Sequence, residues 1–435
     1  MSRQGKSPLK SVSTQSVLVI GLGYVGLPVA SLVNSLPQYQ VTGYDLDPRK
    51  IKAIQASQAN WIDAPTKKRL KRYPLTVTTD SSSLTSYDVI VMCVPTPVDD
   101  QDLPNLDPVL GATATAATLI KPQGLIILES TVNPGVSEEV LIPLLQKADL
   151  EVGQDVFLAH CPERIDPGNS KFPLEKIPRV LGADSPEGLA KAKAFYESFL
   201  KAPVTTVSSL SAAEASKIVE NAFRDINIAF VNELAQSFAH FDIDVVEVIN
   251  AASTKPFGFL AHYPGCGVGG HCIPVDPYYL IESAHQKGYE HRFLKLARDI
   301  NRGMPAYTVN LLLSELSALR LDPQSITIGV LGTSYKPGIG DQRNSPAMEI
   351  FSLLEAQGRT LARFDPLVPS LNTHASLEDL RSDPQIQALI IATNHAEFIA
   401  SLEQDEWPYL KLIIDGRNCL QKWPEGVVYK GIGRG

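Results

Sequence analysis

The first half of the chain alternates between short apolar runs and stretches with helical character. The apolar runs are SVLVIGLG (16–23), QVTGYD (40–45), DVIVMCVP (88–95), GLIILEST (124–131) and DVFLAHCPE (155–163). Segments such as ATATAATLIK lie between them. Nearly continuous apolar strands that alternate with helices indicate a parallel sheet covered by helices on both faces. The pattern predicts an α/β domain over residues 16–207.

A much longer helical pattern begins near Ser208. Apolar side chains recur at helical spacing at Ile218, Ala222, Ile226 and Ala229, and more than thirty residues pass without proline or glycine. At ~1.5 Å per residue this predicts a helix about 45 Å long, which is longer than one domain needs. We expect it to span domains or join subunits, within a central helical segment 208–320.

The strand and helix alternation returns after Asp322 and Pro323. Strand-like runs occur in SITIGVLGTSYK, TLARFDP, ALIIATNH and KLIIDGRN, and SPAMEIFSLLEAQG has helical spacing. This predicts a second, smaller α/β domain over residues 321–435. The expected fold class is α/β, with two Rossmann-like doubly wound domains joined by a long central helix.

The two α/β domains repeat one local pattern. Asp45 ends the strand after the first glycine turn, and Asp365 ends the strand after the turn at Gly332. The second turn lacks a full glycine triplet. We therefore expect it to bind something other than a dinucleotide pyrophosphate.

Composition narrows the class of protein. A chain of 435 residues suggests two or three domains, and no apolar run reaches the 18 residues of a membrane span. Residues 1–15 lack the apolar centre of a signal peptide and are predicted to be a disordered tail. An odd number of cysteines, five, argues against a disulfide framework and for the cytoplasm. A net charge of −8 without a basic run argues against nucleic acid and membrane surfaces as partners.

A dinucleotide motif follows the first predicted strand. Gly21-Leu22-Gly23-Tyr24-Val25-Gly26 has G-x-G-x-x-G spacing, and Asp45 comes 19 residues later at a strand end. The glycines allow a tight turn and close approach of a pyrophosphate, and the carboxylate can accept from ribose hydroxyls. This predicts NAD as cofactor, because a 2′-phosphate would meet the charge of Asp45, although Arg49 weakens that preference. A glycine turn without a ligand is the alternative.

Two later strand ends should reach the same edge of the sheet. Pro95 ends the third run and Thr96 follows it, and Thr131 ends the fourth. Because open α/β sheets bind ligands at the carboxyl ends of their strands, we expect cofactor or substrate contacts here. A capping or turn role for either threonine is the alternative.

Three polar residues share one face of the long helix. Lys217 and Asn221 are spaced i and i+4, and Arg224 follows. An ammonium beside a carboxamide can bind and polarise an alcohol or carbonyl oxygen. A solvated polar stripe is the alternative.

The stretch YPGCGVGGHCIPVDPYYL (263–280) carries four glycines and two cysteines. So much backbone freedom predicts a loop that comes very close to a ligand and presents a cysteine. Pro274 is typical of a first helical turn, so Cys272 should precede a helix N-terminus that stabilises its thiolate, with Asp276 placed to orient a base or water. The alternatives are a buried structural cysteine, a metal site with Cys266 and His271, and a disulfide between the two cysteines.

A nicotinamide site combined with a reactive thiol predicts a particular reaction. Hydride transfer takes an alcohol to an aldehyde, and a thiolate can add to that aldehyde. Oxidation of the thiohemiacetal gives a thioester, which water releases as an acid. The expected reaction is a four-electron oxidation that consumes two NAD.

Eight motifs resemble one family in their order along the chain. They are GLGYVGLPVA, VPTP, ESTVNPG, CPER, KIVENAFR, GVGGHCIPVDP, GTSYKPGIGDQRNSPA and DGRN. The chain is similar to the UDP-glucose/GDP-mannose dehydrogenase family of nucleotide-sugar 6-dehydrogenases. That resemblance implies a UDP-sugar substrate, a C-terminal UDP-binding domain and a homodimer built on the long helix.

The resemblance also implies residue roles. Cys272 would be the nucleophile, and Lys217 and Asn221 would stabilise charge on the reacting oxygen. Thr131 and Asp276 would help to place water, and Glu163 is carried over from the P-E motif. Lys336 and Arg343 would lie near phosphates and cofactor. No metal is implied.

Three sequence features bear on the sugar. PERIDPGN (162–169) replaces the longer pattern of the glucose branch, and Phe257-Gly258-Phe259 and Tyr263-Pro264-Gly265 resemble the UDP-N-acetylhexosamine dehydrogenases. Among these the chain is more similar to the N-acetylglucosamine or galactosamine type, with UDP-N-acetylmannosamine or UDP-glucose as alternatives. Cys266 and Asn344 depart from the proline and glutamate expected there. The substrate-contacting set would be Glu163, Arg164, Lys217, Asn221, Arg224, Phe257, Phe259, Tyr263, Gly265 and Lys336.

Two other protein classes compete with this interpretation. A β-hydroxyacid dehydrogenase combines G-x-G-x-x-G with K-x-x-x-N but oxidises only once, and the cysteine loop and second α/β domain argue against it. A nucleotide-sensing module on an inactive dehydrogenase is opposed by the retained Cys272, Lys217, Asn221 and Asp276.

Overall fold

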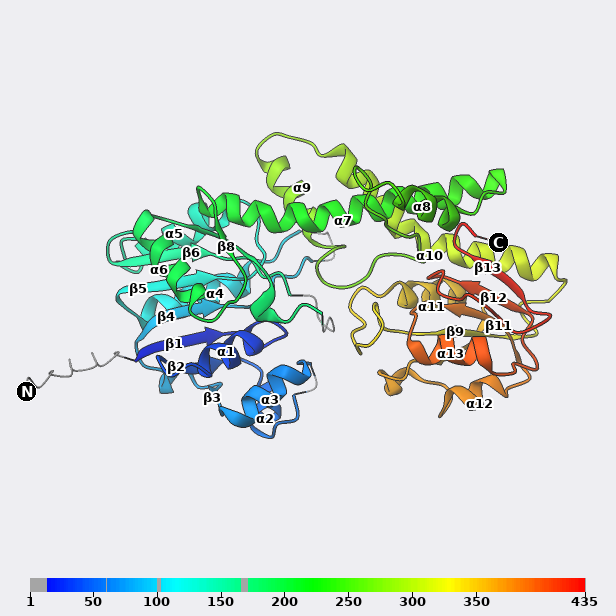
Figure 1. Cartoon of the computed structure of the whole chain (residues 1–435), viewed down its shortest axis with the longest axis horizontal. Coiled ribbons are helices and arrows are strands. Elements are labelled where there is room, and N and C mark those ends of the chain that lie inside the picture. The colour runs from blue at the N-terminus through cyan, green and yellow to red at the C-terminus, as the bar shows by residue number, and fades with distance from the viewer. Residues whose placement is uncertain (1–13, 60, 100–102, 166–170, 435) are drawn as a thin grey trace, which may run out of the picture. The chain divides into compact units, whose positions relative to one another are not determined.

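The computed structural model describes residues 14–59, 61–99, 103–165 and 171–434. The predicted tail 1–15 and the motif residues 166–169 therefore lie mostly outside the described residues, and Gln15 already begins the first strand. The chain divides into two compact units, Met1–Val219 and Glu220–Gly435 (Figure 1).

Unit 1 is built on an eight-stranded sheet with the order β3-β2-β1-β4-β5-β6-β7-β8. Neighbouring strands are parallel except for β6 and β7, which are antiparallel. The strands are β1 Gln15–Ile20, β2 Tyr39–Tyr44, β3 Thr76–Thr78, β4 Tyr87–Met92, β5 Ile120–Leu128, β6 Val156–His160, β7 Arg179–Ala183 and β8 Val204–Thr206. The five predicted runs are β1, β2, β4, β5 and β6. Short β3 and β8 carry no apolar run, and β7 begins with a buried arginine, so the pattern did not predict them.

Helices cover both faces of this sheet. They are α1 Gly26–Asn34, α2 Pro48–Gln55, α3 Ala64–Arg72, α4 Asp107–Leu119, α5 Ile142–Gln146 and α6 Pro186–Glu197. Val17 and Val19 of β1 belong to one apolar cluster, and Leu18 and Ile20 belong to another. Alternating residues of one strand are thus buried on opposite faces, which confirms the predicted doubly covered sheet.

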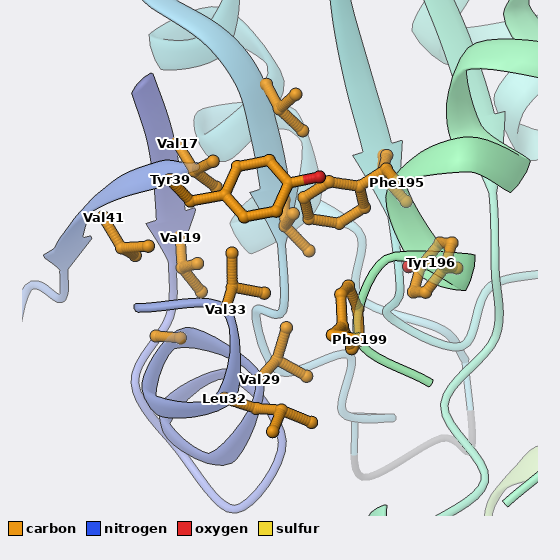
Figure 2. Close-up of a cluster of buried hydrophobic side chains, with 14 of the residues drawn as sticks. Val17, Val19, Val29, Leu32, Val33, Tyr39, Val41, Phe195, Tyr196 and Phe199 are labelled. Carbon is orange, nitrogen blue, oxygen red and sulfur yellow. The ribbon is translucent and has the colours of Figure 1, made fainter. Parts of the chain in front are cut away.

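Aromatic rings of α6 fill one of these faces. Figure 2 shows them beside side chains from β1, β2 and α1. Phe195 makes edge-on contacts with Tyr39, Tyr196 and Phe199, with ring centroids 5.3–5.6 Å apart. Such pairs add to the stabilisation from burial alone, so α6 is held firmly against the sheet.

Helix α7, Leu210–Phe238, has 29 residues and crosses the boundary between the units. Ile218, Ala222 and Ala229 are buried and Ile226 is partly buried, as the helical spacing predicted. At ~1.5 Å per residue the helix is about 43 Å long. Neither α7 nor any other helix in the described part of the chain combines the length and apolarity needed to cross a membrane.

Unit 2 combines helices with a second parallel sheet. Its first helices are α8 Val245–Ser253, α9 Asp276–Gln286 and α10 Arg292–Ala318. The sheet has the order β10-β9-β11-β12-β13. Its strands are β9 Thr327–Leu331, β10 Thr360–Phe364, β11 Ile386–Ile391, β12 Leu412–Asp415 and β13 Val428–Gly431, with α11 Pro346–Ala356, α12 Leu377–Arg381 and α13 Ala396–Gln404.

Both faces of the second sheet are also buried. Ile328 and Val330 of β9 pack in a cluster with α10 and α11, whereas Leu331 packs in a cluster with α12 and α13. The predicted second Rossmann-like domain is confirmed. Strand β13 was not predicted, because its sequence VYKG alternates weakly and contains glycine.

Candidate active site

The glycine turn of unit 1 has the geometry that a dinucleotide requires. Gly21 has φ +92°, and a Cβ there would overlap the carbonyl oxygen of Cys93. A Cβ on Gly26, where α1 begins, would overlap the carbonyl oxygen of Gly21. A Cβ on Gly23 would meet nothing within 4 Å. Two glycines are thus needed for packing, and the third leaves backbone open to a pyrophosphate at a helix N-terminus.

Asp45 ties the end of β2 to this turn. Its carboxylate accepts from the backbone N–H of Leu22 at 2.8 Å, from the N–H of Asp47 at 2.9 Å and from Lys50 Nζ at 2.9 Å. A carboxylate has about four acceptor positions, so one is left for a ribose hydroxyl. The residues of this turn fit NAD.

Lys50, which sequence reasoning missed, is the cation beside Asp45. Arg49 instead is highly exposed and forms a two-point ion pair with Asp47 at 2.9–3.0 Å. Those hydrogen bonds lower the pKa of Asp47 to about 2. The signal for Lys50 was its place in the first turn of α2, which returns toward the strand end.

Replacing Asp45 with asparagine is expected to weaken NAD binding by roughly tenfold, because a charge-assisted hydrogen bond to the ribose is lost while the bond to Leu22 N–H can remain. Discrimination against NADP should fall as well. Fluorescence titration with both dinucleotides measures the two effects. Asp47→Asn is the control, since Asp47 pairs with Arg49; an equal loss in that variant would contradict the assignment.

The other predicted residues of unit 1 lie on loops after adjacent strands. Thr96 follows β4, Thr131 follows β5, and Glu163 follows β6. Ser130 Oγ donates to Val94 O at 2.7 Å, and Glu163 N–H donates to Glu129 O at 3.2 Å. These bonds hold the three loops together at the carboxyl edge, as expected for a ligand site. Pro95 is exposed on the first loop.

A buried polar cluster that sequence reasoning missed lies behind these loops. Tyr196 OH donates to Glu129 Oε1 at 2.6 Å, and Arg179 Nη1 lies 3.7 Å from Glu129 Oε2. All three side chains are almost completely buried. Burial is the largest single influence and opposes the charge of Arg179, but the Glu129 carboxylate and the neighbouring Cys161, Tyr196 and Glu163 groups together outweigh it and raise the pKa of the arginine. The loop that carries Thr131 is therefore anchored by an ion pair.

Unit 2 brings three predicted catalytic residues together. The carbonyl of Cys272 accepts from the N–H groups of Val275 at 3.0 Å and Asp276 at 2.8 Å, so the cysteine precedes α9 by one turn. Asn221 Nδ2 donates to Asp276 Oδ2 at 2.5 Å, and both side chains are buried. The sequence analysis linked Asp276 to Cys272 but did not link either of them to Asn221 by position.

Packing within unit 2 requires two glycines of the cysteine loop. A Cβ on Gly269 would lie 2.6 Å from Tyr335 Cβ, and one on Gly270 would lie 2.9 Å from the Tyr335 ring. Gly270 N–H donates to Arg343 O at 2.9 Å. These glycines therefore allow the loop to approach the loops of the C-terminal domain closely, and the close approach to a ligand stays a prediction.

Cys266 is a structural cysteine. It is fully buried, its N–H donates to Gly416 O at 2.8 Å, and its Sγ lies 3.6 Å from Ala392 O. All five cysteines are free. Across the described ranges of the chain, no group of three or more His, Cys, Asp or Glu side chains is arranged to hold a metal ion.

Burial raises the pKa of the four cysteines other than Cys272. It is the leading cause that raises the pKa of Cys93, Cys266 and Cys419, and it raises the pKa of Cys161 to about 12. A nucleophile must form a thiolate. These four cysteines are therefore poor candidates.

The remaining residues are distributed over both units. In unit 1, Lys217 is only 7% exposed and no described carboxylate of its own unit pairs with it; Arg164 Nη1 donates to Pro178 O at 2.8 Å. In unit 2, Arg224, Phe257 and Tyr263 are exposed.

The other residues of unit 2 lie near its loops. Phe259 is half-buried, and Gly265 is buried. Lys336 lies in the turn after β9, and Arg343 forms a two-point ion pair with Asp341 at 2.6–3.1 Å.

The repeat between the two glycine turns is confirmed in the backbone. Gly21 N–H donates to Tyr44 O and Gly332 N–H donates to Phe364 O, each at 2.8 Å. Asp365, however, is fully buried, and its Oδ2 accepts from the backbone and side chain of both Thr333 and Ser334. That carboxylate has no room for a ribose, in agreement with the prediction that the second turn does not hold a dinucleotide.

Family models match most of the chain. Residues 15–200 match the NAD binding domain of the UDP-glucose/GDP-mannose dehydrogenase family, residues 211–303 match its central domain, and residues 329–422 match its UDP binding domain.

Individual relatives are similar over nearly their whole length. A UDP-N-acetyl-D-mannosamine dehydrogenase of Pyrococcus horikoshii is 36% identical, over 96% of this chain and 99% of its own. A UDP-N-acetyl-D-glucosamine 6-dehydrogenase of Pseudomonas aeruginosa is 33% identical, over 88% and 91%. The solved structure of the UDP-D-ManNAc dehydrogenase from P. horikoshii matches with a TM-score of 0.89 at 36% identity, over 97% and 99% of the two chains.

Proposed function

This chain belongs to the UDP-glucose/GDP-mannose dehydrogenase family, and from that premise we propose that it oxidises C6 of UDP-N-acetylmannosamine to the uronic acid. It is an NAD-dependent UDP-sugar dehydrogenase. The sequence features favoured the gluco or galacto epimer, with the manno epimer as alternative. The full-length similarity to a UDP-N-acetyl-D-mannosamine dehydrogenase supports that alternative. UDP-N-acetylglucosamine is the second candidate, on the similarity to the P. aeruginosa enzyme.

The cluster of Cys272, Asp276 and Asn221 carries the proposal. The glycine turn and Asp45 would hold NAD, which when bound would supply the acceptor for the hydrides that leave C6 in two oxidations. Cys272 Sγ adds to the aldehyde carbon after the first oxidation and holds it as a thiohemiacetal, which the second oxidation converts into a thioester. Water then adds to the thioester carbonyl, the C–S bond breaks, and the thiolate and a carboxylate are released. One alcohol, one water and two NAD thus give one carboxylate, two NADH and three protons.

Charged and polar groups around the sulfur have separate tasks in this scheme. Lys217 and Asn221 stabilise the negative charge that develops on the C6 oxygen. Asp276, hydrogen-bonded to Asn221, orients the water. Thr131 and Glu163 are assigned to the same step on their motifs. Lys336 and Arg343 neutralise charge on phosphates, and the exposed aromatic residues Phe257 and Tyr263 are available to cover the sugar.

We further propose a homodimer built on α7. Phe223 and Phe230 are seven residues apart on this helix, hence on one face, and are 47% and 51% exposed. On α10, Phe293 and Leu296 are also exposed. Large apolar side chains gathered on helices in this way are typical of a surface that a second copy covers.

A substrate panel tests the function directly. With NAD and UDP-N-acetylmannosamine, its gluco and galacto epimers, UDP-glucose and GDP-mannose, the manno epimer should give the highest kcat/KM. The ratio of NADH to uronic acid should be two, because one sulfur retains the half-oxidised sugar. A ratio of one would indicate a β-hydroxyacid type of dehydrogenase. Absence of turnover with every nucleotide sugar would instead indicate a binding module.

A further inference from the structure

A chain of buried polar side chains runs through unit 2 from α10 to the cysteine loop. Arg298 Nη1 donates to Asp225 Oδ1 at 2.6 Å, and Asn301 Nδ2 donates to the same oxygen at 2.8 Å. Asn232 Nδ2 donates to Asn301 Oδ1 at 2.8 Å, and Gly265 N–H donates to Asn232 Oδ1 at 2.9 Å. The four residues are at most 4% exposed. We refer to Arg298, Asp225, Asn301 and Asn232 as the relay.

The ion pair at one end fixes the direction of every bond in the relay. A carboxylate can only accept, so Asn301 must turn its NH₂ toward Asp225 and its oxygen toward Asn232. Asn232 must then turn its NH₂ toward Asn301 and its oxygen toward Gly265 N–H. Burial raises the pKa of Asp225, and Arg298 opposes that shift and favours the ionised acceptor. The orientation of a neutral amide beside the loop is thus set by charges on two helices.

The relay holds the point where the cysteine loop begins. Gly265 is buried, and a buried N–H without an acceptor is strongly unfavourable. From there the loop continues to Cys272, with further backbone bonds from Cys266 to Gly416 and from Gly270 to Arg343. Without Asn232 Oδ1, the first of these attachments is lost, and the segment between α8 and Cys272 is less constrained.

The same ion pair also contacts the far end of the loop. The guanidinium carbons of Arg298 and Arg302 lie 5.8 Å and 5.1 Å from the centroid of the Tyr278 ring. Tyr278 comes two residues after Asp276, in the first turn of α9. Cys272 therefore lies in a loop whose start and end are both fixed to one buried ion pair.

We propose that Asp225, Asn301 and Asn232 are positioning residues for Cys272. They act through the backbone of the loop and do not touch the substrate. The inference rests on the proposed role of Cys272 as nucleophile, and it adds residues that neither the motifs nor the spacing of the sequence identifies. The proposal rests on geometry: a set of buried hydrogen bonds with fixed directions ends on Gly265, near the start of the loop.

Asn232→Ala is the principal test. We expect kcat to fall roughly tenfold or more, because a buried N–H loses its acceptor, while KM for NAD stays within about twofold. Without substrate, alkylation of Cys272 by iodoacetamide should change in rate and in pH profile, measured on the Cys272 peptide by mass spectrometry. A residue that only stabilises the fold would lower the unfolding temperature and leave the alkylation profile of the folded fraction unchanged.

Two further variants complete the comparison. Asn232→Ser keeps one donor and one acceptor and should recover part of kcat; it also provides the test if the alanine variant does not fold. Asn310→Ala removes an exposed asparagine from the same helix as Asn301 and should match the wild type. Wild-type kcat and alkylation in a folded Asn232 variant would overturn the inference. Activity retained by Cys272→Ser would instead overturn the proposed function.

Discussion

Replacing Cys272 with serine is expected to abolish steady production of the uronic acid while leaving the binding of NAD and UDP-sugar close to normal. Serine is nearly isosteric but is a weak nucleophile without a dedicated base, so the aldehyde is no longer captured efficiently. We expect kcat to fall by roughly 10³-fold or more, as for other removed nucleophiles. Steady-state NADH formation and direct quantification of the acid measure the effect.

The first hydride transfer does not need the sulfur, and this gives the experiment a second readout. A single-turnover measurement should still show NADH formed in the variant, with the sugar trapped at the aldehyde level. Cys419→Ser is the matched control, because that half-buried thiol lies beside Asp415 and its pKa is raised chiefly by burial. Acid produced at the wild-type rate by Cys272→Ser would refute the covalent route.

Replacing Lys217 with alanine is expected to lower kcat by roughly 10²–10³-fold, the usual effect of removing one preorganised group that stabilises an oxyanion. Lys217 is buried, and within its own unit no described carboxylate pairs with its ammonium. An ammonium in that setting gains most from the negative oxygen of the reacting alcohol. Stopped-flow measurement of hydride transfer isolates this step.

The affinity for NAD shows whether Lys217 stabilises the substrate oxygen or acts on the cofactor site. NAD binding by Lys217→Ala should stay near the wild-type value, and Lys217→Arg should recover part of the rate by restoring the charge. Lys193→Ala, which removes an exposed lysine from α6, should have no effect. If NAD binding collapses in Lys217→Ala, the lysine acts on the cofactor site and not on the substrate oxygen.

Local signals predicted much of the fold. The apolar runs of β1, β2, β4, β5 and β6 are buried on both faces and therefore leave a clear pattern in the sequence. The glycine motif and Asp45 could be predicted together, because the motif lies in the turn after the first strand and Asp45 lies at the end of the second. Short β3 and β8 were missed because three residues carry too little pattern.

The site was predicted in part. Cys272, Asp276 and Asn221 came from motifs and are brought together in unit 2. The relay was not predicted, because Asn232 and Asn301 are 69 residues apart and nothing in a sequence reveals which two buried amides will meet. The packing of Gly269 and Gly270 against Tyr335 was not predicted for the same reason, because Tyr335 belongs to a distant part of the chain.

The contact of Gly269 and Gly270 with Tyr335 has a consequence for engineering. Exchanging the UDP-binding domain with that of a relative would replace Tyr335 and the surface on which the cysteine loop packs. This would happen even if every catalytic side chain were retained. A chimera joined between α10 and β9 would combine the cysteine loop of one parent with the packing surface of the other, and the two would not be complementary. Graft boundaries should therefore keep the loop and the turn after β9 from one parent.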